Sequence, residues 1–90
     1  MNNPLSDNMD LDFVLEIVKH EVVKAQKKFP TFHSAHEGYA ILKEEVDEMW
    51  TEVKKNNRFQ TLNECIQVAA MAVRFLVDIK TQEQVDNCIT

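Results

Sequence analysis

The sequence predicts an all-α protein that folds as an antiparallel four-helix bundle. Chain breakers are scarce, since the 90 residues include one glycine and two prolines, and an all-β protein would need many turns. Apolar residues recur at steps of three and four along three long segments, which is the spacing of one face of a helix. We expect helices over residues 9–29, 34–55 and 60–80, followed by a short C-terminal helix, with short connections between them.

The composition indicates a single small globular domain. Hydrophobic residues make up 44% of the chain and charged residues 28%, which excludes a disordered protein. A chain of this length buries only roughly 60–65% of the surface that its unfolded form exposes, so the core of one copy is marginal. We therefore expect the chain to associate with a copy of itself, as a homodimer or a larger assembly. Residues 1–8 are polar and are expected to form a flexible N-terminus before one domain over residues 9–90.

Charge and hydropathy exclude two classes of partner. The net charge of −5 disfavours binding to a nucleic-acid polymer, which requires a basic face. No apolar run approaches the roughly 18 residues of a membrane span, and the polar start lacks the core of a signal peptide. Cys65 and Cys88 show no metal or redox spacing, so we interpret them as reduced thiols of a cytoplasmic protein.

The first helix carries two apolar rows. Asp10 or Ser6 caps its start, and Pro30 ends it because proline cannot continue the hydrogen-bond ladder. A second, thinner row holds Phe13 and Ile17, which predicts contact with a further helix or another subunit. The main row consists of Leu11, Val14, Val18, Val22, Ala25 and Phe29.

The next two helices differ in how far apolar residues extend around them. The second begins with a capping-box pattern from Ser34 to Glu37 and ends near Lys55. Its apolar row consists of Tyr39, Leu42, Val46, Met49 and Val53. The third is apolar nearly all round, which is typical of a buried central helix. Thr81 is expected to cap a short last helix that ends near Cys88.

An acidic flank follows the second helix. At about 100° per residue, five glutamates fall within an arc of roughly 100° beside the apolar row: Glu37, Glu44, Glu45, Glu48 and Glu52. Glu45 and Glu48 lie nearest the core edge, and such stacked carboxylates repel one another by a few tenths of a kcal/mol per pair. A divalent cation would offset this repulsion. The alternative is a solvated acidic face that is balanced by Lys43, Lys54 and Lys55.

A narrow polar row interrupts the apolar third helix. Its members are Glu64, Gln67, Met71, Arg74 and Asp78. Polar groups on a buried helix need partners, because an unpaired buried carboxylate is costly. One interpretation places Glu64 in a capping box with Thr61 and pairs Arg74 with Asp78. The other starts the helix earlier, with Asn57 as its cap, and frees Glu64 to face the bundle.

Antiparallel packing of the second and third helices predicts a metal site. It brings Glu45 and Glu48 opposite Glu64 and Gln67, which places three carboxylates and one amide carbonyl around one point. Ligands that are all oxygen suit Mg²⁺ or Mn²⁺ rather than zinc.

These residues resemble a known pattern. The run from Glu44 to Glu48, followed after 15 residues by Glu64-Cys65-Ile66-Gln67, is similar to the EExxE…ExxD pattern of the MazG-like all-α nucleoside triphosphate pyrophosphohydrolases. The resemblance covers roughly residues 9–80 and is to a small single-domain branch found in phage and bacterial genomes. It implies a four-helix bundle assembled as a dimer or tetramer. It also implies Mg²⁺-dependent cleavage of a nucleoside triphosphate to a monophosphate and pyrophosphate.

The resemblance assigns roles to individual residues. Glu45, Glu48 and Glu64 match the metal ligands, and Gln67 stands where the family has aspartate, which removes one negative charge from the site. Glu44 matches a residue that supports the ligands or activates water.

The residues expected to bind the substrate are Lys24, Lys27, Lys28, Glu37 and Tyr39. The alternative for the three lysines is a solvated helix C-terminus.

Other residues have structural interpretations. His33 and His36 are expected in cap or loop roles, because no Glu-x-x-His pair of a di-iron bundle is present. Gly38 is expected to admit a close neighbour, most simply a helix. Tyr39 and Trp50 either stack on a base or pack in an interface or in the core.

Two functions compete with the enzyme. One is a protein of the same fold that has lost its chemistry and acts as a nucleotide sensor or a partner-binding helical module. The other is a purely structural protein of a phage or mobile element.

Overall fold

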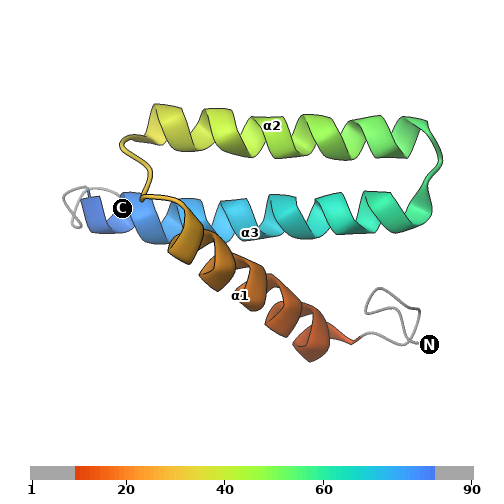
Figure 1. The fold of residues 1–90 in the computed structure, drawn as a ribbon, viewed down its shortest axis with the longest axis horizontal. Coiled ribbons are helices and arrows are strands. Elements are labelled where there is room, and N and C mark those ends of the chain that lie inside the picture. The colour runs from red at the N-terminus through yellow and green to blue at the C-terminus, as the bar shows by residue number, and fades with distance from the viewer. Residues whose placement is uncertain (1–9, 83–90) are drawn as a thin grey trace.

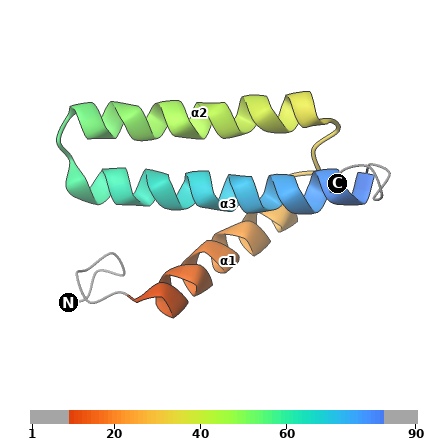
Figure 2. The same ribbon diagram turned by 180° about the vertical axis from the view of Figure 1, so that it is seen from behind.

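The computed structural model describes residues 10–82, which form three helices: α1 (Leu11–Lys28), α2 (Ala35–Lys54) and α3 (Arg58–Gln82). The helices α2 and α3 run antiparallel and side by side as a hairpin, and α1 crosses α3 obliquely (Figure 1). Both α1 and α2 pack against α3, and within the described part of the chain they do not pack against each other. Seen from behind, α3 lies in front of α1 (Figure 2).

The expected all-α class is confirmed, but the expected four-helix bundle is not. Residues 10–82 contain three helices. Nothing breaks α3 near residue 80, so the helix continues through Thr81 and Gln82, and the expectation that Thr81 caps a new helix is wrong. The remainder of the expected last helix, residues 83–88, and the expected flexible N-terminus, residues 1–8, lie outside the described residues.

The local sequence explains where α1 and α2 begin. The Asp10 carboxylate accepts a hydrogen bond from the amide of Phe13 at 2.9 Å, and Ser34 Oγ accepts one from the amide of Glu37 at 3.1 Å. Each bond satisfies an amide that has no partner within its helix. The Glu37 side chain does not complete the expected capping box with Ser34, because it accepts instead from the amide of His33.

The start of α3 decides between the two interpretations of Glu64. Asn57 Oδ1 accepts a hydrogen bond from the amide of Gln60 at 3.1 Å, so Asn57 is the cap and Thr61 lies inside the helix. The preceding Asn56 adopts a left-handed conformation with φ of 59°, which asparagine tolerates and which allows a tight connection between α2 and α3. Glu64 is therefore free of a capping role.

The core lies where α1 and α2 meet α3. It consists of Val18, Val22, Phe32, Ala70, Met71 and Ile79. Gly38 of α2 makes this packing possible, because a Cβ atom there would lie 2.7 Å from Cδ2 of Phe75 and 3.0 Å from Cδ2 of Phe32. The expected role of Gly38 in close helix packing is confirmed.

The expectation that α3 is buried nearly all round is wrong. Val73, Leu76 and Val77 are exposed, because the two neighbouring helices cover only part of the circumference of α3. The apolar row of α2 is also covered in part, since Val46 and Val53 are exposed while Leu42 packs against the core. None of α1, α2 and α3 is long and apolar enough to cross a membrane.

Candidate metal centre

Three carboxylates from two helices converge on one point. Glu45 and Glu48 of α2 and Glu64 of α3 each place one carboxylate oxygen so that the three atoms lie within 4.8 Å of one another. Glu45 and Glu64 are half-buried, and Glu48 is exposed. The expected meeting of these glutamates is therefore confirmed, and we call the three residues the acidic cluster.

The sequence positions this cluster through spacing and capping. Glu45 and Glu48 are three residues apart and project from one side of α2. The short connection at residues 55–57 sets the register of the antiparallel hairpin, and the Asn57 cap leaves Glu64 on the side of α3 that faces them.

The cluster is electrostatically unfavourable for three ionised carboxylates. Burial raises the pKa of Glu45 above its ordinary value, and the nearby charges of Glu48 and Glu64 raise it further. Burial also raises the pKa of Glu64, with added repulsion from Glu48 and Glu52. A bound divalent cation would reverse this preference, because it favours the charged form of each ligand. The all-oxygen donor set fits Mg²⁺ or Mn²⁺.

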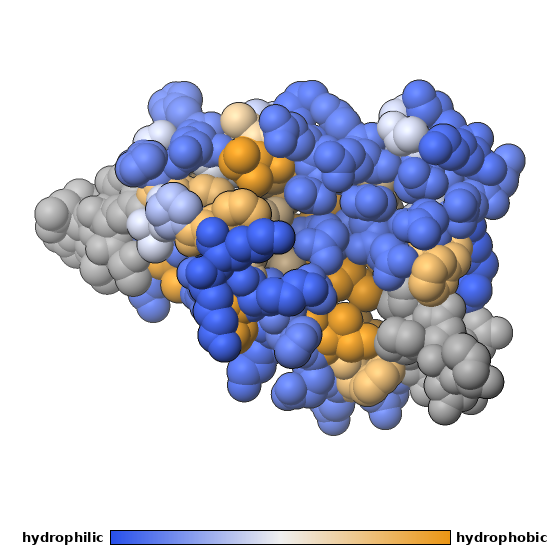
Figure 3. Space-filling model, in the orientation of Figure 1, coloured by the Kyte–Doolittle hydropathy of each residue, from blue (hydrophilic) through white to orange (hydrophobic). Residues whose placement is uncertain are grey.

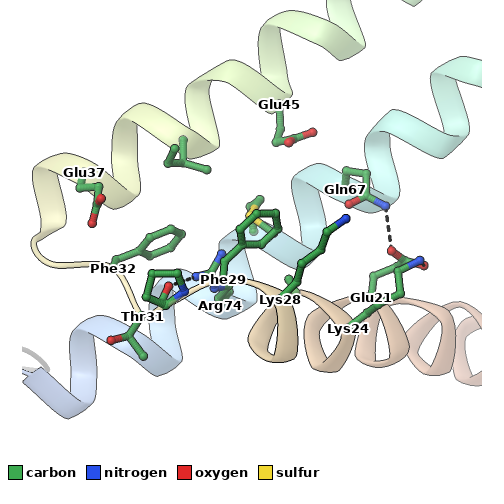
Figure 4. Close-up of a pocket in the computed structure, with 14 residues that line it drawn as sticks. Glu21, Lys24, Lys28, Phe29, Thr31, Phe32, Glu37, Glu45, Gln67 and Arg74 are labelled. Carbon is green, nitrogen blue, oxygen red and sulfur yellow. Dashed lines mark hydrogen bonds and ion pairs between the residues drawn. The ribbon is translucent and has the colours of Figure 1, made fainter.

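Gln67, one turn after Glu64, makes a contact that the sequence did not predict. Its Nε2 donates a hydrogen bond to Oε1 of Glu21 on α1 at 3.0 Å (Figure 4). This hydrogen bond is the main cause that lowers the pKa of Glu21, and Lys24, whose Nζ lies 3.4 Å from Glu21 Oε2, lowers it further. In the sequence, the only indication that Glu21 could meet a residue of another helix is its position beside the apolar row of α1.

A cleft of about 490 Å³ adjoins the acidic cluster. Its walls come from the C-terminal half of α1, residues 29–32, the N-terminal half of α2 and the middle of α3 (Figure 4). Glu45 belongs to both the cluster and the cleft, and Gln67 lines the cleft beside it. On this side of the molecule, hydrophobic patches are framed by hydrophilic side chains (Figure 3).

The residues expected to contact a substrate separate into two groups. Lys24, Lys28 and Glu37 line the cleft. Lys27 and Tyr39 are exposed and are not among its lining residues. Lys24 and Lys28 share one side of α1 because they are four residues apart, whereas Lys27 is turned about 100° from Lys28.

Glu44 is exposed, and its charge contributes to the raised pKa of Glu45. His33 and His36 are exposed, and neither belongs to a group of potential metal ligands in residues 10–82.

A buried ion pair holds the end of the cleft in place. Arg74 and Asp78 are 4% and 2% exposed, and Arg74 Nε lies 3.5 Å from Asp78 Oδ2. Asp78 accepts a hydrogen bond from the amide of Phe32 at 3.0 Å, and Arg74 donates one to the carbonyl of Pro30. The Arg74 guanidinium also lies 4.3 Å from the centre of the Phe32 ring. The expected pairing of Arg74 with Asp78 is confirmed, and it anchors the connection between α1 and α2.

Comparisons with known proteins identify no relative. No family model matches the chain, and no curated protein or solved structure is significantly similar to it.

Proposed function

We propose that this protein is a Mg²⁺-dependent nucleotide pyrophosphohydrolase that converts a nucleoside triphosphate to a monophosphate and pyrophosphate. The observation that supports the proposal best is the position of Glu45, which belongs to both the acidic cluster and the adjoining cleft. A metal held by the cluster would therefore face a substrate held in the cleft.

The acidic cluster supplies the proposed metal ligands. Glu45, Glu48 and Glu64 would hold Mg²⁺, with Mn²⁺ as a substitute, because hard cations prefer carboxylate oxygens. When bound, the metal lowers the pKa of a water molecule and neutralises charge on the phosphates. Glu44, next to Glu45 on α2, is proposed to accept a proton from the attacking water or to support the ligands.

The cleft supplies the proposed substrate contacts. Lys24 and Lys28 bring positive charge to the α1 wall, where each would attract phosphate as a point charge. Phe29, half exposed after the end of α1, lines the cleft, and Lys28 Nζ and the Arg74 guanidinium lie 5.7 Å and 5.9 Å from the centre of its ring. These groups position an anionic substrate, and positioning is the main protein contribution in phosphoryl transfer. Nucleoside triphosphates are cytoplasmic metabolites, so the proposed activity belongs in the cytoplasm.

A second candidate is a nucleotide sensor of the same fold with weakened catalysis. Gln67 uses its amide donor for Glu21, and it brings no negative charge to the site where the family pattern has aspartate. Such a site would hold its metal less tightly while the cleft still binds the nucleotide.

A pyrophosphate-release assay tests the first candidate against the second. The full chain is incubated with a panel of ribo- and deoxynucleoside triphosphates in Mg²⁺ or in chelator. The enzyme releases pyrophosphate from at least one nucleotide in Mg²⁺ alone. Nucleotide binding by calorimetry without any release would identify the sensor, and the absence of both would contradict both candidates.

A further inference from the structure

The carboxylate of Glu21 on α1 lies in the wall of the cleft, close to the acidic cluster. Glu21 Oε1 accepts a hydrogen bond from Gln67 Nε2 at 3.0 Å, and Glu21 Oε2 lies 3.4 Å from Lys24 Nζ. The Glu21 side chain is 20% exposed, whereas that of Lys24 is 65% exposed. Glu21, Gln67 and Glu45 all line the cleft (Figure 4). A negative charge from α1 therefore reaches the cleft one side chain away from α3.

The hydrogen bond from Gln67 determines which way its amide faces. A glutamine amide can present either its NH₂ donors or its carbonyl acceptor, but an ionised carboxylate only accepts. The hydrogen bond from Gln67 is the main cause that lowers the pKa of Glu21, so Glu21 is ionised at neutral pH. The amide nitrogen must then face Glu21, and the carbonyl oxygen is directed away from it (Figure 4). No donor within residues 10–82 meets this oxygen, which leaves it free to accept.

Gln67 lies on the same side of α3 as the acidic cluster. It follows Glu64 by three residues, which places the two Cβ atoms about 5–6 Å apart on one side of the helix. It also shares the cleft wall with Glu45 of α2. Side-chain amide carbonyls are ligands that hard cations accept beside carboxylates. The free oxygen of Gln67 therefore fits the donor set of the proposed metal centre.

We propose that Glu21 is a positioning residue of this metal centre, which holds the Gln67 amide so that its carbonyl oxygen joins the three carboxylates as a ligand. Outer carboxylates commonly orient metal ligands and strengthen them as donors, and a hydrogen bond at one end of an amide polarises the other end. Through Gln67, Glu21 supplies the negative charge that an aspartate at position 67 would bring directly. This role rests on the metal centre of the proposed function, but it does not require hydrolysis.

A purely structural tie between α1 and α3 would use the same hydrogen bond with a different consequence. Loss of such a tie would lower the stability of the protein but would leave the metal affinity of the folded chain unchanged. Loss of a positioning residue lowers that affinity even where the helices are intact. Metal affinity without substrate therefore separates the two roles.

Metal titration of the full chain without nucleotide tests the role of Glu21. The probe is Mn²⁺, whose free form is measured by electron paramagnetic resonance, and Mg²⁺ is then added to displace it. Glu21→Gln should weaken Mn²⁺ binding by about 10- to 100-fold, because an amide at position 21 brings no charge and no longer fixes the orientation of Gln67. Glu16→Gln is the matched control, since Glu16 is an exposed carboxylate of α1 that does not line the cleft. Circular dichroism verifies that each variant keeps its helices.

A double-mutant cycle shows whether Glu21 acts through Gln67. Gln67→Met removes the carbonyl oxygen at similar side-chain length and should also weaken Mn²⁺ binding. Adding Glu21→Gln to Gln67→Met should cause no more loss than Glu16→Gln does, because residues that act as one unit are not additive. An equal further loss would mean that the charge of Glu21 acts on the ion directly, and it would overturn the positioning role.

The side-chain amide signals of Gln67 give a second readout by nuclear magnetic resonance. In isotope-labelled protein these signals are identified by their loss in Gln67→Met, and they should shift when Mg²⁺ is added. Signals that Mg²⁺ does not move, or unchanged Mn²⁺ affinity in Glu21→Gln, would overturn the role of Glu21 and leave the proposed function standing. A wild-type chain that binds no Mn²⁺ would overturn both. The expected losses of affinity without any pyrophosphate release would support the role of Glu21 and contradict only the hydrolase.

Discussion

The two sides of α3 differ in polarity: polar residues lie on the side that faces the other helices, and apolar residues lie on the outer side. Its inner side carries the polar residues Glu64, Gln67, Arg74 and Asp78, which meet α2, α1 and the connection between them. Its outer side carries the exposed apolar residues Val73 and Leu76, which no described helix covers. A solvated helix normally shows the reverse arrangement. The comparison teaches that the polar residues of α3 face its neighbouring helices, where they find partners or join the acidic cluster, while its most exposed apolar residue, Leu76, lies on the side that these helices leave open.

The inner side itself has two parts with different electrostatics. Asp78 faces the positive charge of Arg74 at 3.5 Å, whereas the neighbours that raise the pKa of Glu45 and Glu64 are other carboxylates. The first part is a structural pair that orders the connection at residues 29–34. In the second part, like charges face one another without a cation between them among the described residues.

The largest effect is expected when a carboxylate of the acidic cluster is removed. Glu64→Ala should reduce Mg²⁺-dependent pyrophosphate release by more than about 100-fold, since even residues that only support metal ligands cost 10–100-fold. Glu45→Ala and Glu48→Ala should behave alike. Asp47→Ala is the matched control, because Asp47 is an exposed carboxylate of α2 that pairs with Lys43. Near-normal release by all three cluster variants would contradict the assignment.

The second prediction concerns the buried pair. Asp78→Ala should lower the free energy of unfolding by about 3–5 kcal/mol, because it leaves the charge of Arg74 buried without its partner. Urea denaturation measures the change. The double variant Arg74→Met with Asp78→Leu should recover most of the loss, and Asp47→Ala, which breaks an exposed pair, should cost at most about 1 kcal/mol. A loss from Asp78→Ala as small as that control would show that the pair is not needed for the fold.

The third prediction concerns the contact between α1 and α3. Gln67→Glu should lower the free energy of unfolding by about 1–2 kcal/mol at neutral pH, because Glu21 loses a donor to its carboxylate. The swapped variant, Glu21→Gln with Gln67→Glu, restores one donor and one carboxylate. It should recover a coupling energy of about 0.5–2 kcal/mol in a double-mutant cycle measured in chelator. Additive losses would argue against the hydrogen bond.

The smallest expected effect is a pH dependence of stability. The folded protein raises the pKa values of Glu45 and Glu64 above the ordinary 4.5, so it binds more protons than the unfolded chain in the window just above that value. The contribution of these residues to stability is therefore present at lower pH and is lost as the pH rises through the raised pKa values. Glu21 acts in the opposite sense, because its pKa is lowered and its contribution is lost as the pH falls below 4.5.

Thermal unfolding in chelator from about pH 4 to about pH 7 measures this effect. Glu64→Gln should flatten the decline above pH 4.5, and saturating Mg²⁺ should abolish it in the wild type. Glu21→Gln is the control, since it should change only the acid limb. A decline that Glu64→Gln leaves unchanged would locate the titrating group elsewhere.

Local signals predicted most of the secondary structure. Asp10, Ser34 and Pro30 place the boundaries of α1 and α2 within one or two residues of the expected ones, because capping and proline effects act over a single turn. The start of α3 was open between two caps, since Asn57 and Thr61 both have suitable side chains. Only the observed hydrogen bond from Gln60 decides for Asn57.

The sequence by itself determined the helices, the side of α2 that carries the glutamates, and their meeting with Glu64 once the hairpin is antiparallel. The tertiary structure decided that Gln67 pairs with Glu21, that α1 crosses α3 obliquely, and that neither α1 nor α2 covers the side of α3 that carries Leu76. Helical periodicity defines which residues share a face, because it depends only on the turn of the backbone. It contains no information about which neighbour covers that face, since this depends on the crossing angles and on the total apolar area that the helices bury together.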